Sequence, residues 1–200
     1  MSVKLTDFES DLLRLSIVHN RFESIYLEYP NHMVEGRKAL FLKHLFREIV
    51  VEQLHNFIKI RNDLRKNSKF EKLDEIIKIM VEPILEHKKP IKELRNNYVS
   101  HIQEGGRKFK ETTNEIVLKY NFPTSFSFYQ YLAGLVSYYS LIVKNNFKEE
   151  YKKSAKKYEA IRGEQIQINS GFKMKDVDDK IQKILFELKN SLEKHGFSIT

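Results

Sequence analysis

The sequence contains no cysteine, and glycine and proline are scarce. Of its 200 residues, 7 are glycine and 4 are proline. The lack of cysteine excludes disulfides, thiol catalysis and metal sites built on thiolates, and it suits a reducing cytoplasm. Few glycines and prolines leave few tight turns, which strands would need often, so the sequence predicts a nearly all-helical chain.

Long hydrophobic runs are also missing. No window approaches the roughly eighteen consecutive apolar residues of a membrane-spanning helix. The first residues, MSVKLTDFESDLLRL, carry charges throughout and lack the apolar centre of a signal peptide. We therefore expect a cytoplasmic protein with no membrane partner.

Charge is abundant and unbalanced. The chain has 35 Lys and Arg against 27 Asp and Glu, a formal net charge of +8. A basic surface attracts polyanions because it releases their counterions. RNA is the expected partner, although a lysine-rich composition produces a basic chain without any such partner.

Apolar residues at helical spacing predict six helices. The first begins at a capping box formed by Thr6 and Glu9. Proline is tolerated in the first turn of a helix, which suits Pro90, whereas Pro83 should kink or end the helix before it. The expected helices cover about residues 8–29, 35–66, 70–86, 90–104, 125–144 and 175–195. The stretch 107–125 is the most irregular and is interpreted as a linker or excursion.

These elements predict an all-α fold, an up-and-down helical bundle with additional C-terminal helices. Short connections favour an antiparallel bundle of four helices in residues 1–104. Residues 105–200 are expected to form a helical extension that packs on the bundle or extends it, with the boundary near Gly105.

The stretch ELRNNYVSHI, residues 93–102, combines polar and apolar residues in an informative way. On a helical wheel at 100° per residue, Arg95 lies inside the apolar arc and His101 lies at its edge. A guanidinium on a buried face needs an anionic partner, because an unpaired buried charge is costly. That partner is either a carboxylate of this chain or a phosphate from outside.

The segment RNNYVSH, residues 95–101, resembles the R-x(4–6)-H signature of HEPN domains, with Asn96 in the polar position after the arginine. The resemblance implies a HEPN-like helical bundle with the motif on a late helix, and often a homodimer in which two motifs face each other. Active members of the family are metal-independent endoribonucleases of toxin–antitoxin, phage-defence and RNA-processing systems.

The resemblance also implies residue roles. Arg95 would hold the scissile phosphate and stabilise its charge in the transition state. His101 would act as general acid or base during attack by the RNA 2′-hydroxyl, and Asn96 would orient the histidine or the phosphate. No metal or cofactor is needed. Some HEPN toxins carry a modifiable tyrosine two residues after the histidine, where this chain has Gln103.

Two alternatives stay open for this motif. Some HEPN domains are non-catalytic modules that bind RNA or a protein partner, such as an antitoxin. In a purely structural alternative, Arg95 forms an internal ion pair and His101 caps a helix C-terminus. Under the HEPN resemblance, Glu48 or Glu52 of the second helix could pair with Arg95 between the helices and hold it ready.

Two other patterns on the second helix have ordinary structural explanations. Glu52 and His55 form one E-x-x-H motif, but a di-iron bundle needs two, so no metal site is predicted. Arg61 and Asn62 resemble the start of a second motif, but no histidine follows, and they are interpreted as exposed helix.

The C-terminal half offers two further features. Six aromatic residues between 126 and 139 could stack on bases, but such a stripe is more often core or dimer interface. Six lysines between 144 and 157 could follow a phosphate backbone, but a solvated face is the simpler interpretation. Walker, Rossmann and G-x-S-x-G patterns are missing.

Overall fold

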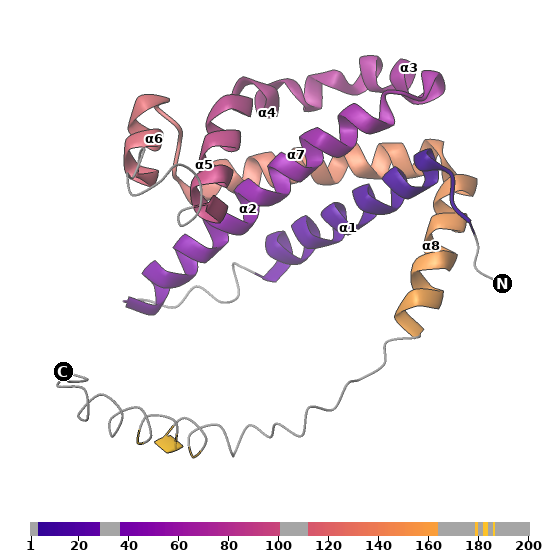
Figure 1. Cartoon of the computed structure of the whole chain (residues 1–200). Coiled ribbons are helices and arrows are strands. Elements are labelled where there is room, and N and C mark those ends of the chain that lie inside the picture. Colours follow the sequence, from indigo (N-terminus) through magenta and orange to yellow (C-terminus); the bar gives the residue numbers. More distant parts are fainter. Residues whose placement is uncertain are drawn as a thin grey trace. The chain divides into compact units, whose positions relative to one another are not determined.

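The computed structural model describes residues 4–28, 37–100 and 112–163, together with the isolated positions 179, 182, 183 and 186. Every regular element in these ranges is helical and none is a strand, which confirms the all-α prediction (Figure 1). The α-helices are α1 (Asp7–Glu28), α2 (Arg37–Leu64), α3 (Ser68–Ile77), α4 (Glu82–Glu86), α5 (Lys88–Ser100), α6 (Thr113–Lys119), α7 (Phe126–Asn146) and α8 (Lys148–Gly163). A short 3-10 helix, η2 (Lys78–Met80), separates α3 from α4.

The core lies between the three long helices. Helix α1 packs against α2 and α7, and α2 also contacts α7 and α5 (Figure 1). Their inward faces bury large apolar side chains completely, which is the main stabilising term of the fold. Fully buried members include Leu15, Phe22, Leu54, Phe57 and Val136.

The predicted capping box opens α1. The Thr6 amide donates to the Glu9 carboxylate at 2.9 Å, and the Glu9 amide donates to the Thr6 hydroxyl at 3.2 Å. Glu9 also joins α1 to α8, because Lys153 donates to its carboxylate at 3.0 Å and Ser154 donates to its carbonyl oxygen at 2.7 Å. Hydrogen bonds from Thr6 and Lys153 lower the pKa of the Glu9 carboxyl, and the Thr6 amide contributes most. One capping residue therefore also anchors a helix far away in sequence.

The predicted helix over residues 70–86 is interrupted. Asn67 caps α3 by accepting from the amides of Lys69 and Phe70, each at 3.1 Å. The α-helix ends at Ile77, η2 follows, and α4 restarts with Pro83 in its first turn. Proline cannot continue the hydrogen-bond ladder of a preceding helix but fits a new first turn. The proline was thus correctly expected to disturb this stretch.

The stretch predicted as a linker contains a helix, so that part of the interpretation was wrong. Thr112 and Glu115 form a second capping box at the start of α6, and the Thr112 amide donates to the Glu115 carboxylate at 2.6 Å. The helix ends in a left-handed turn at Asn121, with φ of 45°. There the Phe122 amide donates to the Val117 carbonyl at 2.9 Å, a bond typical of a Schellman cap.

Helix α7 has no charged residue before Lys144 and begins at Ser125, whose hydroxyl accepts from the Phe128 amide at 3.3 Å. The inner face is buried, including Tyr129 and Tyr139. The outer face keeps large side chains exposed, with Tyr138 at 65% exposure. The lysine-rich stretch forms a separate helix: α7 ends at Asn146, Phe147 caps it, and α8 begins at Lys148.

Residues 1–160 form one compact unit and 161–200 a second. Helices α6 and α7, which follow the boundary predicted near Gly105, belong to the first unit together with α1–α5. Gly105 itself, the expected end of the motif helix, and most of the helix expected at 175–195 lie outside the described residues. No helix in the described ranges has the length and hydrophobicity needed to cross a membrane.

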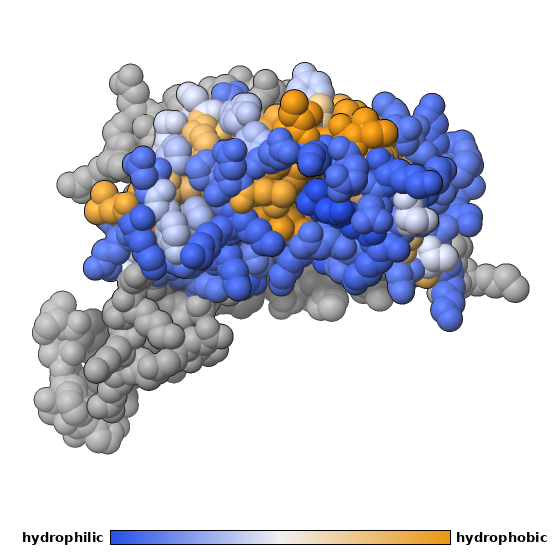
Figure 2. Space-filling model, turned by 90° about the horizontal axis from the view of Figure 1, so that it is seen from above, coloured by the Kyte–Doolittle hydropathy of each residue, from blue (hydrophilic) through white to orange (hydrophobic). Residues whose placement is uncertain are grey.

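One face of the first unit combines apolar and polar side chains. Figure 2 shows hydrophobic side chains gathered within a mostly hydrophilic surface when the molecule is seen from above. The most exposed apolar residues of α3 and η2 are Ile76 and Ile79, at 77% and 73% exposure. Scattered exposed apolar residues are normal for a protein surface, so these two do not by themselves indicate a site.

Candidate functional site

Helix α5 carries the motif, and its apolar face holds it on α2. Ile91 and Leu94 are completely buried, as their spacing on the wheel predicted. The helix begins at Lys88, so Pro90 lies in its first turn, also as predicted. Arg95 directly follows Leu94 on this helix, which packs against α2, and its side chain is half-buried.

Helix α6 holds α5 from a second side. The Tyr120 hydroxyl donates to the Glu93 carboxylate at 2.6 Å, and Lys119 forms an ion pair with the same carboxylate at 3.3 Å. The Thr113 hydroxyl donates to the Asn97 side-chain oxygen at 2.8 Å. Tyr120 and Lys119 lower the pKa of Glu93, with Tyr120 contributing most. The segment taken for a linker thus positions the motif helix.

The positive charge of the Arg95 guanidinium has few hydrogen-bond or ion-pair partners among the described residues. Its only hydrogen bond to another described side chain runs from Nη1 to the Asn96 oxygen at 3.4 Å, which is long for a hydrogen bond. Its Nε is buried and has no partner among the described residues. Glu48 and Glu52 are both described, and neither forms an ion pair with Arg95, so the pairing suggested from the sequence is wrong.

The three predicted site residues stand differently in the structure. Arg95 and Asn96 are both half-buried and in contact with each other. His101 lies outside the described residues, as does Gln103. The placement of Arg95 follows the prediction from the wheel, whereas the distance between Arg95 and His101 stays a prediction.

A residue that the motif analysis did not include lies near Arg95. His55 of α2 is half-buried, and its Nδ1 is buried without a partner among the described residues. Burial lowers the pKa of His55, and the positive charges of Lys59, Arg95 and Lys92 lower it further. The imidazole is therefore neutral near pH 7 and lies beside three cations. In the sequence, the E-x-x-H spacing marks His55 as a possible metal ligand and gives no sign that it lies near Arg95.

The E-x-x-H motif, Glu52 and His55, has no further metal-ligating side chains grouped with it among the described residues. Glu52 is exposed, and its effect on His55 is the weakest of the charges that act on that residue. Across the residues that the structure describes, no group of three or more histidine or carboxylate side chains could hold a metal ion.

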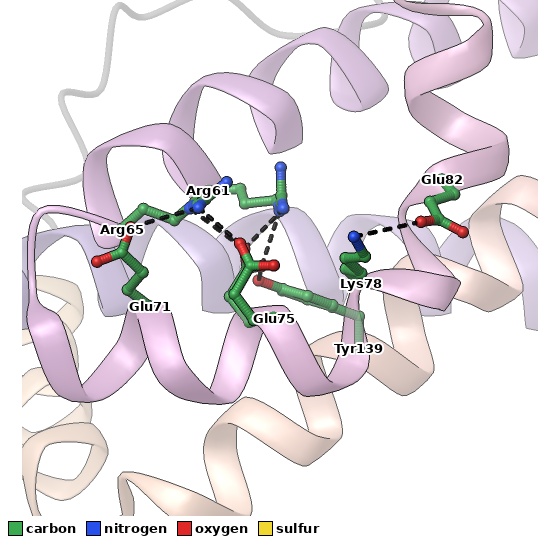
Figure 3. Close-up of polar contacts among 8 residues, drawn as sticks. Arg61, Arg65, Glu71, Glu75, Lys78, Glu82 and Tyr139 are labelled. Carbon is green, nitrogen blue, oxygen red and sulfur yellow. Dashed lines mark hydrogen bonds and ion pairs between the residues drawn. The ribbon is translucent and has the colours of Figure 1, made fainter.

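A second polar cluster lies deep in the bundle, and it corrects the interpretation of Arg61 as exposed helix. Arg61 is 5% exposed and forms two hydrogen bonds with the fully buried Asp74, at 2.7 and 2.6 Å. The Tyr139 hydroxyl also donates to Asp74 at 2.6 Å, and Arg65 reaches it at 3.4 Å. Figure 3 shows Arg61 of α2, Arg65 directly after α2, and Tyr139 of α7 turned toward one another. The neighbouring Asn62 is exposed, as expected.

This buried cluster is structural. Every charged group in it has a partner, because Arg65 also pairs with Glu75 at 2.7 Å and with Glu71 at 3.3 Å. Burial and the bond to Asp74 raise the pKa of Tyr139, so the hydroxyl stays protonated and donates. A satisfied network of this kind ties α2, α3 and α7 together and leaves no group free for a ligand.

The aromatic and lysine-rich stretches divide by face. Tyr129 and Tyr139 belong to the core, whereas Tyr131 and Tyr138 are exposed. The α8 lysines are mostly exposed, and Lys152 pairs with Glu149 at 2.7 Å. This exposure fits both interpretations of the lysines, a solvated face and a face that follows a phosphate backbone.

Comparisons of the chain with models of known protein families, with curated proteins and with solved structures find no match.

Proposed function

We propose that this protein is a metal-independent endoribonuclease of toxin–antitoxin or phage-defence type, with Arg95, Asn96 and His101 at its site. The observation that carries the proposal is the state of Arg95. Its guanidinium is half-buried, has a buried Nε without a partner, and forms no ion pair among the described residues. An arrangement that leaves such a cation uncompensated is suited to an anion from outside, and RNA presents phosphates.

The proposed chemistry needs only side chains. Arg95 holds the scissile phosphodiester and stabilises the charge that develops on its oxygens. His101 moves the proton of the attacking 2′-hydroxyl or of the leaving 5′-oxygen. The P–O5′ bond breaks as the 2′-oxygen bonds to phosphorus, so the products are a 2′,3′-cyclic phosphate and a 5′-hydroxyl.

RNA cleavage in excess EDTA tests this proposal. We expect wild type to cut RNA and to leave cyclic-phosphate ends. We expect Arg95→Ala and His101→Ala each to lose on the order of a hundredfold or more, the usual effect of removing a charge-stabilising or acid–base group. Arg14→Ala is the matched control, because Arg14 is half-exposed and pairs with Asp11 at the surface.

The proposal fails if the folded wild type leaves varied RNAs uncut, or if it cuts and both variants cut equally well. The cleavage assay is read together with circular dichroism, so that an unfolded variant is not mistaken for a catalytic defect. Dependence of cleavage on added Mg²⁺ would also contradict a metal-independent mechanism.

A second candidate function is a non-catalytic helical module that binds RNA or a protein partner such as an antitoxin. The outer face of α7 favours it, because Tyr131, Tyr138 and Leu141 are exposed on a helix without charge before Lys144. A helix that is apolar on all sides is usually covered on all sides. Binding without cleavage in the same assay would select this alternative. Either function is compatible with a homodimer, which the mass of the protein in solution would show.

A further inference from the structure

Three cationic side chains from two packed helices lie near His55. His55 and Lys59 lie one helical turn apart on α2, and Lys92 and Arg95 lie one turn apart on α5. Residues at these spacings share one side of a helix. Lys59, Arg95 and Lys92 all act on the charge of His55, and α2 packs against α5, so these cations lie near His55 at the α2–α5 contact. We call His55 and these three cations the α2–α5 basic cluster.

Negative charge near the cluster is sparse. Among the described residues, Lys59, Lys92 and Arg95 take part in no ion pair. Glu52 is the one acid found to act on His55, and it acts more weakly than each of the three cations. Positive charges that are held near one another repel. This repulsion costs folding free energy unless an anion binds among them.

Other arginines of the chain show that this is not the ordinary pattern. Arg61 and Arg65 bind the buried Asp74, and Arg14 binds two carboxylates at the surface. Arg21 donates to the Gln53 side-chain oxygen at 3.1 Å. Arg95 has only the long contact with the Asn96 amide. Among these arginines, Arg95 has the longest and weakest side-chain hydrogen bond and no carboxylate partner among the described residues.

Two buried nitrogen atoms of the cluster also lack partners. These are Nε of Arg95 and Nδ1 of His55, one on each helix. Buried polar atoms are normally satisfied by hydrogen bonds, and leaving one unsatisfied costs folding free energy. Two such atoms on facing helices, beside exposed lysines, have the composition of an incomplete anion site.

We propose that the α2–α5 basic cluster is the phosphate-binding site for single-stranded RNA, and that His55 contacts the phosphate held by Arg95. This inference deepens the proposed function and rests on it for the identity of the ligand. Lys59 and Lys92 add the mobile positive charge that follows the backbone to neighbouring phosphates. The site spans two helices, so it is larger than the motif on α5.

Binding should carry a proton with it. In the free protein, the groups that face His55 are Lys59, Arg95 and Lys92, which favour the neutral imidazole, and Glu52, which opposes them. A bound phosphate adds negative charge and favours the imidazolium, so the pKa of His55 rises on binding. Affinity should therefore increase as the pH falls from about 8 to about 5.5, the range in which histidine titrates.

The first experiment follows the histidine resonances of the intact wild-type protein by NMR. The probes are inorganic phosphate and a single-stranded oligodeoxythymidylate, which lacks the 2′-hydroxyl needed for cleavage. We expect the pKa of His55 to rise by about one unit or more at saturation with the oligonucleotide. His19 is the internal control, because it is also half-buried with an unpartnered Nδ1, but the charges acting on it are Glu23 and Lys144.

Variants supply the second measurement. His55→Gln should remove the part of the pH dependence of oligonucleotide binding that His55 contributes, whereas His19→Gln should leave it intact. Lys59→Gln and Lys92→Gln should each reduce the slope of log affinity against log salt by about 0.7, the value for one phosphate contact on a single strand. The wild-type titration keeps the inference testable even if a variant fails to fold.

The outcomes separate this inference from the proposed function. If RNA is cleaved through Arg95 and His101 while His55 does not respond to the oligonucleotide, the inference falls and the ribonuclease stands. If His55 responds but no RNA is cut, the binding site stands and the ribonuclease falls. A response to inorganic phosphate without one to the oligonucleotide overturns the assignment to RNA.

Discussion

Asp74 is the centre of a buried hydrogen-bond network in the interior. It is fully buried, and it accepts hydrogen bonds from Arg61 of α2 and Tyr139 of α7. A buried ion pair contributes little compared with a well-packed apolar core, but breaking it leaves a buried charge without a partner. The location of this pair explains why α3, a short helix, is held against two long ones.

We therefore predict that Asp74→Asn lowers the free energy of unfolding by about 3–5 kcal/mol, because it leaves the Arg61 charge uncompensated. Tyr139→Phe should cost less, about 1–3 kcal/mol, since it removes one donor from a carboxylate that keeps Arg61. Urea denaturation monitored by circular dichroism measures both.

Asp63→Asn is the matched control for Asp74→Asn. Asp63 pairs with Arg14 and Lys66 at the surface, where removing an ion pair costs at most about 1 kcal/mol. Equal losses for Asp63→Asn and Asp74→Asn would show that burial does not set the energetics of these pairs.

At the scale of elements, α7 has two unlike faces. Its inner face packs into the core, whereas Gly134 lies on a side where an added Cβ would meet no atom within 4 Å. Glycine in a helix interior costs about 1 kcal/mol relative to alanine, so the free energy of unfolding is lowered here without a packing reason among the described residues.

We predict that Gly134→Ala raises the free energy of unfolding by about 1 kcal/mol and Tm by about 2–4 °C, as expected for a chain of this size. Thermal unfolding measures the change. Ala133→Gly is the matched control with the opposite sign, because Ala133 is 1% exposed and its methyl group packs in the core. A loss of stability in Gly134→Ala would mean that something outside the described residues lies close to that side of α7.

At the scale of the whole molecule, partly buried histidines link stability to pH. Burial lowers the pKa values of His19, His55 and His87 in the folded protein. The unfolded chain, with pKa values near 6.5, therefore binds more protons than the folded one as the pH falls below neutrality. The stability that these groups contribute is complete above the unfolded pKa and is lost as the pH falls through the folded pKa values.

We predict that the midpoint of urea unfolding is steady from about pH 8 to pH 7 and falls between about pH 6.5 and pH 5. The triple variant His19→Gln, His55→Gln, His87→Gln should lose most of this fall. A second fall below about pH 4.5 should remain in the triple variant, because the pKa values of carboxylates such as Glu9 and Glu93 are also lowered. An unchanged fall above pH 5 in the triple variant would contradict the prediction.

Local signals predicted much of the fold. The capping box at Thr6, the first-turn position of Pro90 and the apolar spacing of Ile91 and Leu94 all act within one or two helical turns. Such interactions depend on neighbours in sequence, so they can be recognised without a structure. The helix α6 has an equally local signal in Thr112 and Glu115, which the irregular look of the surrounding stretch obscured.

The environment of the site could be predicted only in part. The wheel placed Arg95 inside the apolar arc of its helix, but spacing along α5 carries no information about α2. Arg61 and Arg95 are alike in sequence, each followed by asparagine. One is sealed against Asp74 and the other forms no ion pair among the described residues, because the packing of α3 brings an acid to the first.

The sequence by itself determined that the chain is helical, where most of its helices begin, and which faces turn inward, since these follow from hydrogen bonds and apolar periodicity over a few residues. Only the tertiary structure decided which charges meet. It paired Arg61 with Asp74, and it brought Lys59, Arg95 and Lys92 near His55 with little opposing charge. Electrostatic energy depends on distances between residues far apart in the chain, and those distances exist only once the helices have packed.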